Sequence, residues 1–138
     1  MNKSHTYKGG NTMDIKVLKV EPGKNPEETF LSTDIRSIQE AVSIGAPGRC
    51  FFQTVYLEKN VVLLCNDAGK LIGLEGNRRI GRDIIAGVFY ITECDSDGNL
   101  ISISDKNLLF YKIIFWKPEK FTPEEMEEAK KPILIRIR

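Results

Sequence analysis

The sequence has little histidine, and this scarcity argues against much of the familiar catalytic chemistry. His5 is the only histidine in 138 residues and lies in a polar stretch, so acid–base or triad chemistry based on histidine has no candidate. The cysteines are few (Cys50, Cys65 and Cys94), odd in number and widely spaced, which favours reduced thiols over disulfides or zinc ligands. We therefore expect a protein that is not an enzyme and needs no metal or cofactor.

An excess of charge of one sign is also lacking. Lys and Arg number 20 against 19 Asp and Glu, so the net charge of +1 gives no overall field that would attract nucleic acid or a membrane. No apolar run approaches the roughly 20 residues that cross a bilayer. The polar residues 1–12 lack the apolar core of a signal peptide. These features predict a cytoplasmic protein with no membrane partner, and they argue against nucleic acid as a partner.

The pattern of apolar residues predicts one α+β domain with a mainly antiparallel sheet of about five strands and two or three helices. Hydrophobic residues at 41% and charged residues at 28% are ordinary for a globular chain of this size. The expected strands are residues 15–20, 29–31, 51–57, 61–65, 70–74, 84–92 and 100–103. Because the later strands follow one another with short turns, we expect a meander.

Capping residues predict the first two helices. Asp34 is a good N-cap for a helix that runs to Ile44. Ser104 or Asp105 can cap a second helix over residues 106–116, which is apolar almost all round. That segment is either a buried helix or a strand, and its capping residue and its length favour the helix.

The last part of the chain is expected to extend the domain. Thr122 and Glu125 form a capping box around a proline at the first helical position, which predicts a short third helix. Residues 133–138 alternate in polarity and are either an edge strand or a tail that binds a partner. We expect a flexible tail over residues 1–12, the α+β domain over 13–117, and a helix and tail extension over 118–138.

A stretch with three arginines, Gly76-Asn77-Arg78-Arg79-Ile80-Gly81-Arg82, lies between two apolar runs and is the strongest binding candidate. Its glycine spacing fits neither a P-loop nor a dinucleotide fingerprint. Guanidinium groups that point outward from a loop offer forked donors to phosphate or carboxylate. The alternative is that they bind carbonyl and carboxylate groups of the fold itself. The candidate ligand-binding residues are Asn77, Arg78, Arg79, Gly81, Arg82 and Asp83.

Aromatic residues on the expected neighbouring strands could add a stacking platform beside this loop. Alternation along the strands indicates Tyr56 and Tyr90 as the exposed candidates. Binding of nucleic acid along this surface is a weak hypothesis, because one basic loop on a nearly neutral protein releases few counterions.

Several short motifs resemble one protein family. They are KVLKVEPG at residues 16–23, QEAV at 39–42, VYL at 55–57, NDAGKL at 66–71, NRRI at 77–80 and DIIAG at 83–87. Through them, residues 15 to about 105 resemble the family called domain of unknown function 3846, small proteins encoded largely by phages, plasmids and conjugative elements of Gram-positive bacteria. The part from Lys106 departs from the short ending expected of that family. The resemblance implies an accessory protein of a mobile element that acts in the host cytoplasm.

Taken together, these observations predict a non-catalytic binding protein that acts against host defence. The preferred hypothesis is that the arginine loop binds an anionic, nucleotide-like ligand or signal. The first alternative is an inhibitor that binds a host defence protein directly, through an exposed sheet edge or the residues 133–138. The second is a DNA-binding accessory factor. Homo-oligomerisation is left open, because a small sheet with a free edge can pair with another copy.

Overall fold

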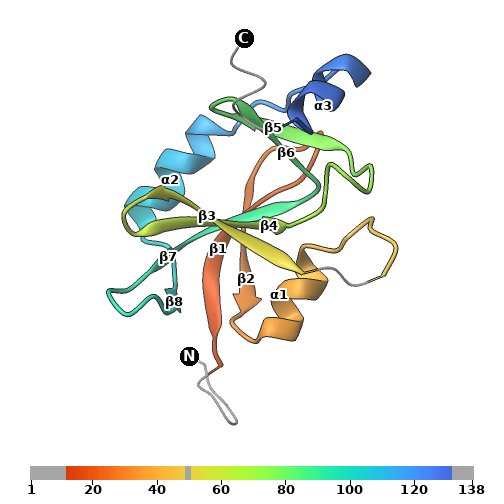
Figure 1. Ribbon diagram of the computed structural model, residues 1–138. Helices are drawn as coiled ribbons and strands as arrows, with labels where there is room; N and C mark the ends of the chain where they lie inside the picture. The colour runs from red at the N-terminus through yellow and green to blue at the C-terminus, as the bar shows by residue number, and fades with distance from the viewer. Residues whose placement is uncertain (1–11, 49–50, 132–138) are drawn as a thin grey trace.

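A six-stranded antiparallel sheet forms the centre of the structure, a computed structural model that describes residues 12–48 and 51–131 (Figure 1). Its strands are β1 (Asp14–Val20), β2 (Glu27–Ser32), β3 (Phe52–Glu58), β4 (Val61–Asn66), β7 (Phe89–Cys94) and β8 (Leu100–Ile101). Two further strands, β5 (Gly76–Ile80) and β6 (Asp83–Ala86), form a separate hairpin. The predicted α+β class is confirmed. Cys50, the segment 133–138 and residues 1–11 of the predicted tail lie outside the described residues.

The order of the strands differs from the predicted meander. The sheet runs β2-β1-β7-β4-β3, with β8 beside β7, so the first strand is an internal strand next to the edge strand β2. Leu18 pairs with Glu28 of β2 on one side and with Ile91 of β7 on the other. β1 is suited to an internal position because its side chains are apolar on both faces: Val17 and Leu18 point to opposite faces of the sheet, and both are buried.

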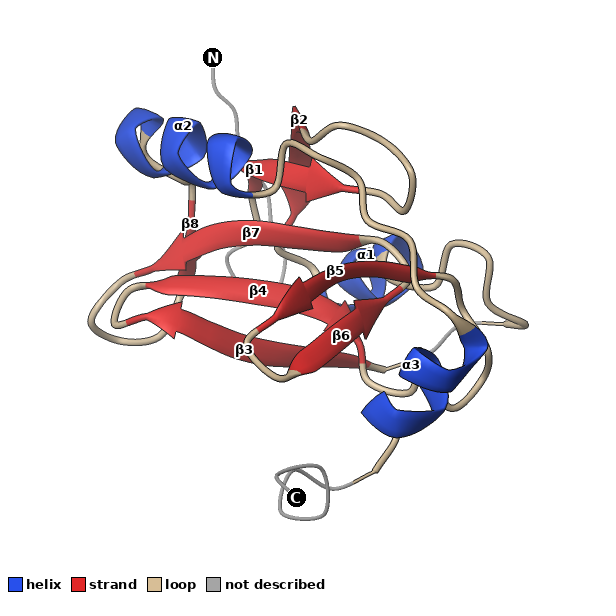
Figure 2. Ribbon diagram, turned by 90° about the horizontal axis from the view of Figure 1, so that it is seen from above, coloured by secondary structure: helices blue, strands red, loops and turns tan. Residues whose placement is uncertain are grey.

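Each face of the sheet is covered by different elements (Figure 2). Helix α1 (Ile35–Ala41) covers one face and packs through Ile38 against Leu64 and Tyr90. Helix α2 (Asp105–Ile114) and the β5–β6 hairpin cover the other face, where Phe89 and Leu63 lie in their core. Helix α3 (Pro123–Ala129) lies beside the hairpin. The hairpin and α2 are therefore neighbours on the same side of the sheet.

The predicted helix starts are confirmed. The Asp34 carboxylate accepts a hydrogen bond from the Ser37 amide at 3.1 Å at the start of α1. The helix is shorter than predicted: it ends at Ala41 and not at Ile44, and turns follow it. The Ser104 hydroxyl caps α2, so the helical alternative for the segment after it is correct, although the helix ends at Ile114 and not at Trp116. The capping box at Thr122 is also present.

Two strand predictions are wrong. Residues 70–73 of the expected strand 70–74 form turns, in which the Ile72 amide donates a hydrogen bond to the Ala68 carbonyl oxygen at 3.0 Å. The expected strand 84–92 is two strands, β6 and β7, because Gly87 has a φ of 85°, a left-handed conformation that breaks the extended backbone. The break turns the chain from the hairpin into the central sheet.

Candidate functional site

The three arginines lie on the β5–β6 hairpin, in which only Gly81 and Arg82 form the turn. Gly81 has a φ of 60°, which such a tight turn requires. The pairing register shifts between Gly76 and Arg78, and this β-bulge allows the consecutive side chains of Asn77 and Arg78 both to be buried. The expectation of a loop that carries three outward arginines is therefore corrected.

Arg78 is fully buried, and the structure itself accounts for its donors. Its Nε and Nη2 atoms donate to the carbonyl oxygen of Phe115 at 3.0 and 2.8 Å. Nη2 also donates to the Lys24 carbonyl oxygen at 2.7 Å, and Nη1 donates to Asn77 Oδ1 at 2.8 Å. Phe115 is the C-cap of α2, where the helix dipole favours a cation. Arg78 thus holds the end of α2 and does not face a ligand, although burial lowers its pKa from the usual value.

Asn77 also points inward. Its amide nitrogen donates to the carbonyl oxygens of Val20 at 2.8 Å and Gly87 at 2.9 Å, and its side chain is fully buried. These bonds join the hairpin to β1 and to the break between β6 and β7. The proposed ligand-binding role of Asn77 is corrected to a role within the fold.

Arg79 and Arg82 are the exposed arginines of the hairpin. The Arg79 guanidinium lies 3.5 Å from the Glu125 carboxylate and 5.6 Å above the centre of the Phe121 ring. Arg82 forms no ion pair with any residue that the structure describes. Both border a hollow of about 320 Å³. Carboxylates outnumber guanidinium groups there, because the other charged residues that line it are Glu124, Glu125 and Glu128.

Asp83 is paired with a lysine. Its carboxylate forms an ion pair with Lys70 and accepts a hydrogen bond from the Ile84 amide at 2.8 Å. Asp83 and Lys70 line a second hollow of about 230 Å³, which Arg79 and Arg82 do not border. The residues predicted as one site therefore divide between the interior and two separate hollows.

The two tyrosines do not form a stacking platform beside the arginines. Tyr90 is buried, its hydroxyl donates to the Ala41 carbonyl oxygen at 3.2 Å, and burial raises its pKa to about 12. The expectation that Tyr90 is exposed was wrong. Tyr56 is exposed, but its neighbours Val55 and Leu57 pack into the core on the hairpin side, so Tyr56 points to the opposite face of the sheet.

A surface that the sequence analysis did not select lies on α2. The side of α2 toward the sheet buries Tyr111 and Phe115, while large apolar side chains on the other side are 50% to 66% exposed. Monomeric proteins rarely leave a contiguous apolar patch of this kind uncovered. The signal was present in the sequence, because a short helix on one sheet can bury only one side, and residues 106–116 are apolar almost all round. We call this surface the α2 face; it consists of Leu109, Phe110, Ile113, Ile114 and Trp116.

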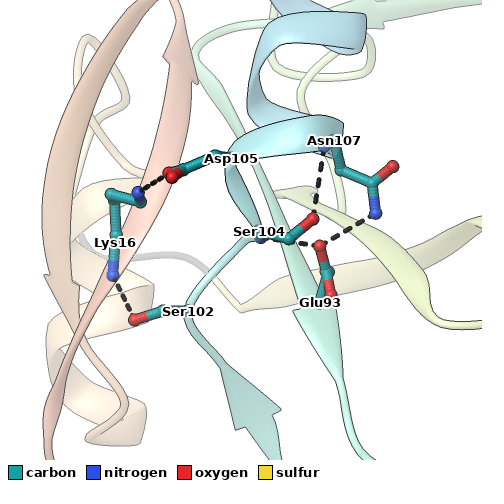
Figure 3. A network of polar contacts seen from close by, with 6 residues as sticks. All are labelled: Lys16, Glu93, Ser102, Ser104, Asp105 and Asn107. Carbon is teal, nitrogen blue, oxygen red and sulfur yellow. Dashed lines mark hydrogen bonds and ion pairs between the residues drawn. The ribbon is translucent and has the colours of Figure 1, made fainter.

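The first turn of α2 is fixed to the sheet by a polar network (Figure 3). The Ser104 amide and the Asn107 side-chain amide donate to one carboxylate oxygen of Glu93, at 2.7 and 2.8 Å. Beside them, the Lys16 ammonium lies 2.6 Å from the Asp105 carboxylate. Burial alone would raise the pKa of Glu93, but these hydrogen bonds outweigh it and hold that pKa below the usual value. The hydrogen bond from Lys16 likewise lowers the pKa of Asp105.

The last turn of α2 is fixed as well. Besides the bonds from Arg78 to the Phe115 carbonyl oxygen, the Asn25 side chain donates to the Trp116 carbonyl oxygen at 2.7 Å. The Phe115 ring packs edge-on against Phe89, with 5.5 Å between the ring centres. The helix therefore presents the α2 face on a support that is tied down at both ends.

The model of a family described as a domain of unknown function (DUF3846) matches residues 15–127. The match continues through α2 and most of α3, so the departure that we expected from Lys106 is corrected. No curated protein and no solved structure matches the chain. Among the described residues, no helix has the length and apolar character needed to cross a membrane.

Proposed function

Since the chain belongs to the family called domain of unknown function 3846, and the family match includes α2, we propose that it is a non-catalytic domain that binds a partner protein through the α2 face. The observation that carries this proposal is the exposure of five large apolar side chains, four on α2 and Trp116 just after its C-cap. Burying such side chains against a partner removes apolar surface from water, and this is the main favourable term in most protein association. Aromatic anchors such as Trp116 are also enriched among the residues that dominate binding energy.

The fixed ends of α2 support the same proposal. A partner that binds a helix already held by Glu93 and Arg78 does not have to order that helix first. Association then costs less conformational entropy than binding through a flexible segment. The arginine-containing hairpin contributes indirectly, because Arg78 holds the helix end in place.

We further propose the setting in which this binding takes place. The partner is a host protein, and the chain is an accessory protein of a phage or another mobile element that acts in the host cytoplasm against host defence. The support for this setting is the resemblance to a family of proteins that such elements are expected to encode. The proposed function is thus that of an inhibitor that binds a host protein directly, as in the first alternative of the sequence analysis. The proposed contact surface is the α2 face, and not a sheet edge.

The proposal is tested by placing a photo-cross-linking residue at Leu109 in cells that carry the natural gene, and at Leu71 as the matched position. Leu71 is 74% exposed and lies in a turn away from α2. The protein that cross-links only through position 109 is then purified, and its dissociation constant is measured with Ile113→Glu and with Leu71→Glu. We expect Ile113→Glu to weaken binding about tenfold or more, as loss of an interface anchor does, and Leu71→Glu to have little effect. Equal binding by both variants would sink the proposal.

An anionic ligand at the hairpin is a second candidate. The observation in its favour is that Arg82 has no ion pair within residues 12–48 and 51–131 and borders a hollow of about 320 Å³. The three glutamates along the same hollow oppose an anion, so we rank this candidate below the α2 face. Denaturing the purified protein and analysing released small molecules by mass spectrometry tests it. A phosphorylated compound retained by the wild type and lost in Arg82→Ala would favour it.

A further inference from the structure

The α2 face has a lysine at each of its ends. Lys106, Phe110 and Ile113 follow one another at intervals of four and three positions, the spacing that places residues on one side of a helix, and Lys117 follows the end of α2. Lys106 lies in the first turn of α2, and Lys117 follows the C-cap by two residues; both are exposed.

The nearby carboxylates at the first turn of α2 have other partners. Asp105 is paired with Lys16, and Glu93 accepts the hydrogen bonds of the helix N-terminus. Within the part of the chain that the structure describes, neither Lys106 nor Lys117 forms an ion pair. Two unpaired cations thus border the apolar middle of the face.

We propose that the partner of the α2 face is an acidic amphipathic helix, with an apolar stripe and a carboxylate toward each end of it. This inference rests on the proposed function and adds the chemistry of the partner. The apolar stripe covers Phe110, Ile113 and their neighbours, and the carboxylates face Lys106 and Lys117. Opposite charges around an apolar centre fix the register of the partner and raise the rate of association.

A second copy of this chain fits the face less well. When two α2 helices pair in parallel, Lys106 lies opposite Lys106 of the other copy. When they pair antiparallel, Lys106 lies opposite Lys117. Both arrangements place like charges together at the ends of the apolar stripe, and this opposes self-association.

An anionic membrane also fits the face less well. Asp105 begins α2, and its side chain is 92% exposed, so a flat anionic surface laid on the helix would approach a carboxylate as well as lysines. Two lysines give only a small attraction to such a surface, at about 1 kcal/mol each, and the net charge of +1 adds little. A protein partner can instead place its charges separately opposite each position.

The test uses the full chain and two synthetic helical peptides with the same leucine and isoleucine stripe. One peptide carries glutamates toward the ends of the stripe, and the other carries lysines. We expect the glutamate peptide to bind at least about tenfold more tightly, with an affinity that falls as salt is added. The double variant Lys106→Glu with Lys117→Glu should reverse this preference, and Ile113→Glu should abolish binding of both peptides.

The outcomes separate the inference from the proposed function. Equal binding of the two peptides, or no binding of the glutamate peptide, overturns the acidic partner while leaving the α2 face as an interface. Binding of the glutamate peptide that survives Ile113→Glu overturns both. Analytical ultracentrifugation that shows a dimer lost in Ile113→Glu would identify a second copy as the occupant. Co-sedimentation with phosphatidylserine vesicles that is lost in Ile113→Glu would identify a membrane; either result overturns the inference.

Discussion

The guanidinium of Arg78 and the carbonyl oxygen of Phe115 are joined by two hydrogen bonds, at 3.0 and 2.8 Å, although the residues lie 37 positions apart in the chain. This contact links the β5–β6 hairpin to the end of α2. It also explains why an arginine occupies a fully buried position, because the carbonyl oxygens around it accept hydrogen bonds from a fork of donors.

Arg78→Ala should strongly destabilise the protein. The substitution leaves the carbonyl oxygens of Phe115 and Lys24 without these donors, and hydrogen bonds to charged groups contribute about 1.5–3 kcal/mol each. We expect the free energy of unfolding in urea to fall by about 2–4 kcal/mol. Arg82→Ala, at the exposed turn of the same hairpin, serves as the control and should change it by about 0.5 kcal/mol or less. Similar losses in the two variants would contradict the role given to Arg78.

Gly87→Ala should cost more stability than Gly98→Ala. Both glycines have a φ of 85°, so alanine is strained at either position, at about 1 kcal/mol or more. A Cβ on Gly87 would also lie 2.8 Å from Leu74 Cδ1, whereas a Cβ on Gly98 meets no heavy atom within 4 Å. Thermal unfolding of the two variants should therefore show a lower midpoint for Gly87→Ala. Equal midpoints would mean that Leu74 moves aside without cost.

Acid should weaken the attachment of α2 through Glu93. The pKa of Glu93 is lower in the folded protein than in the unfolded chain, where a glutamate titrates near about 4.3. Its contribution is present above that value and is lost as the pH falls through the lower folded pKa. Unfolding curves from neutral to acid pH should show a smaller loss of stability for Glu93→Gln than for the wild type. Glu124→Gln, an exposed carboxyl on α3, is the control and should follow the wild type.

Cys65 should resist alkylation in the native protein. The thiol is buried, and burial raises its pKa to about 11, so at pH 8 only about one molecule in a thousand carries the reactive thiolate. Iodoacetamide labelling followed by peptide mass spectrometry should leave Cys65 unmodified in buffer and modify it in urea. Rapid labelling in buffer would show that the hollow beside Cys65 opens readily.

Features encoded by neighbouring residues could be predicted from the sequence. Asp34 and Thr122 cap helices because each side chain reaches an amide three positions away, and such local chemistry is visible in the chain. The fate of Arg78 was not visible, since it depends on a carbonyl oxygen from a distant helix. The break at Gly87 was missed because the apolar residues around it continue as if in one strand.

The candidate site shows the same division. The arginines attracted attention because guanidinium groups are good ligand donors, yet the bulge that turns Arg78 inward is a property of strand pairing. A helix was correctly expected after Ser104, but which of its sides is covered depends on how α2 lies on the sheet. The apolar character of this segment can be seen in a single sequence. Which of its side chains are exposed cannot, because that depends on how the helix packs on the sheet.

Because Arg78 belongs to the hairpin and two of its hydrogen bonds end on the C-cap of α2, the helix cannot swing away without breaking both of these charge-assisted bonds. Amide hydrogens of α2 and of β5 should therefore exchange with solvent as one cooperative unit, at a free energy well above that of the exposed turns. A partner that binds the α2 face would then bind a preorganised surface, whose backbone conformation need not change on binding.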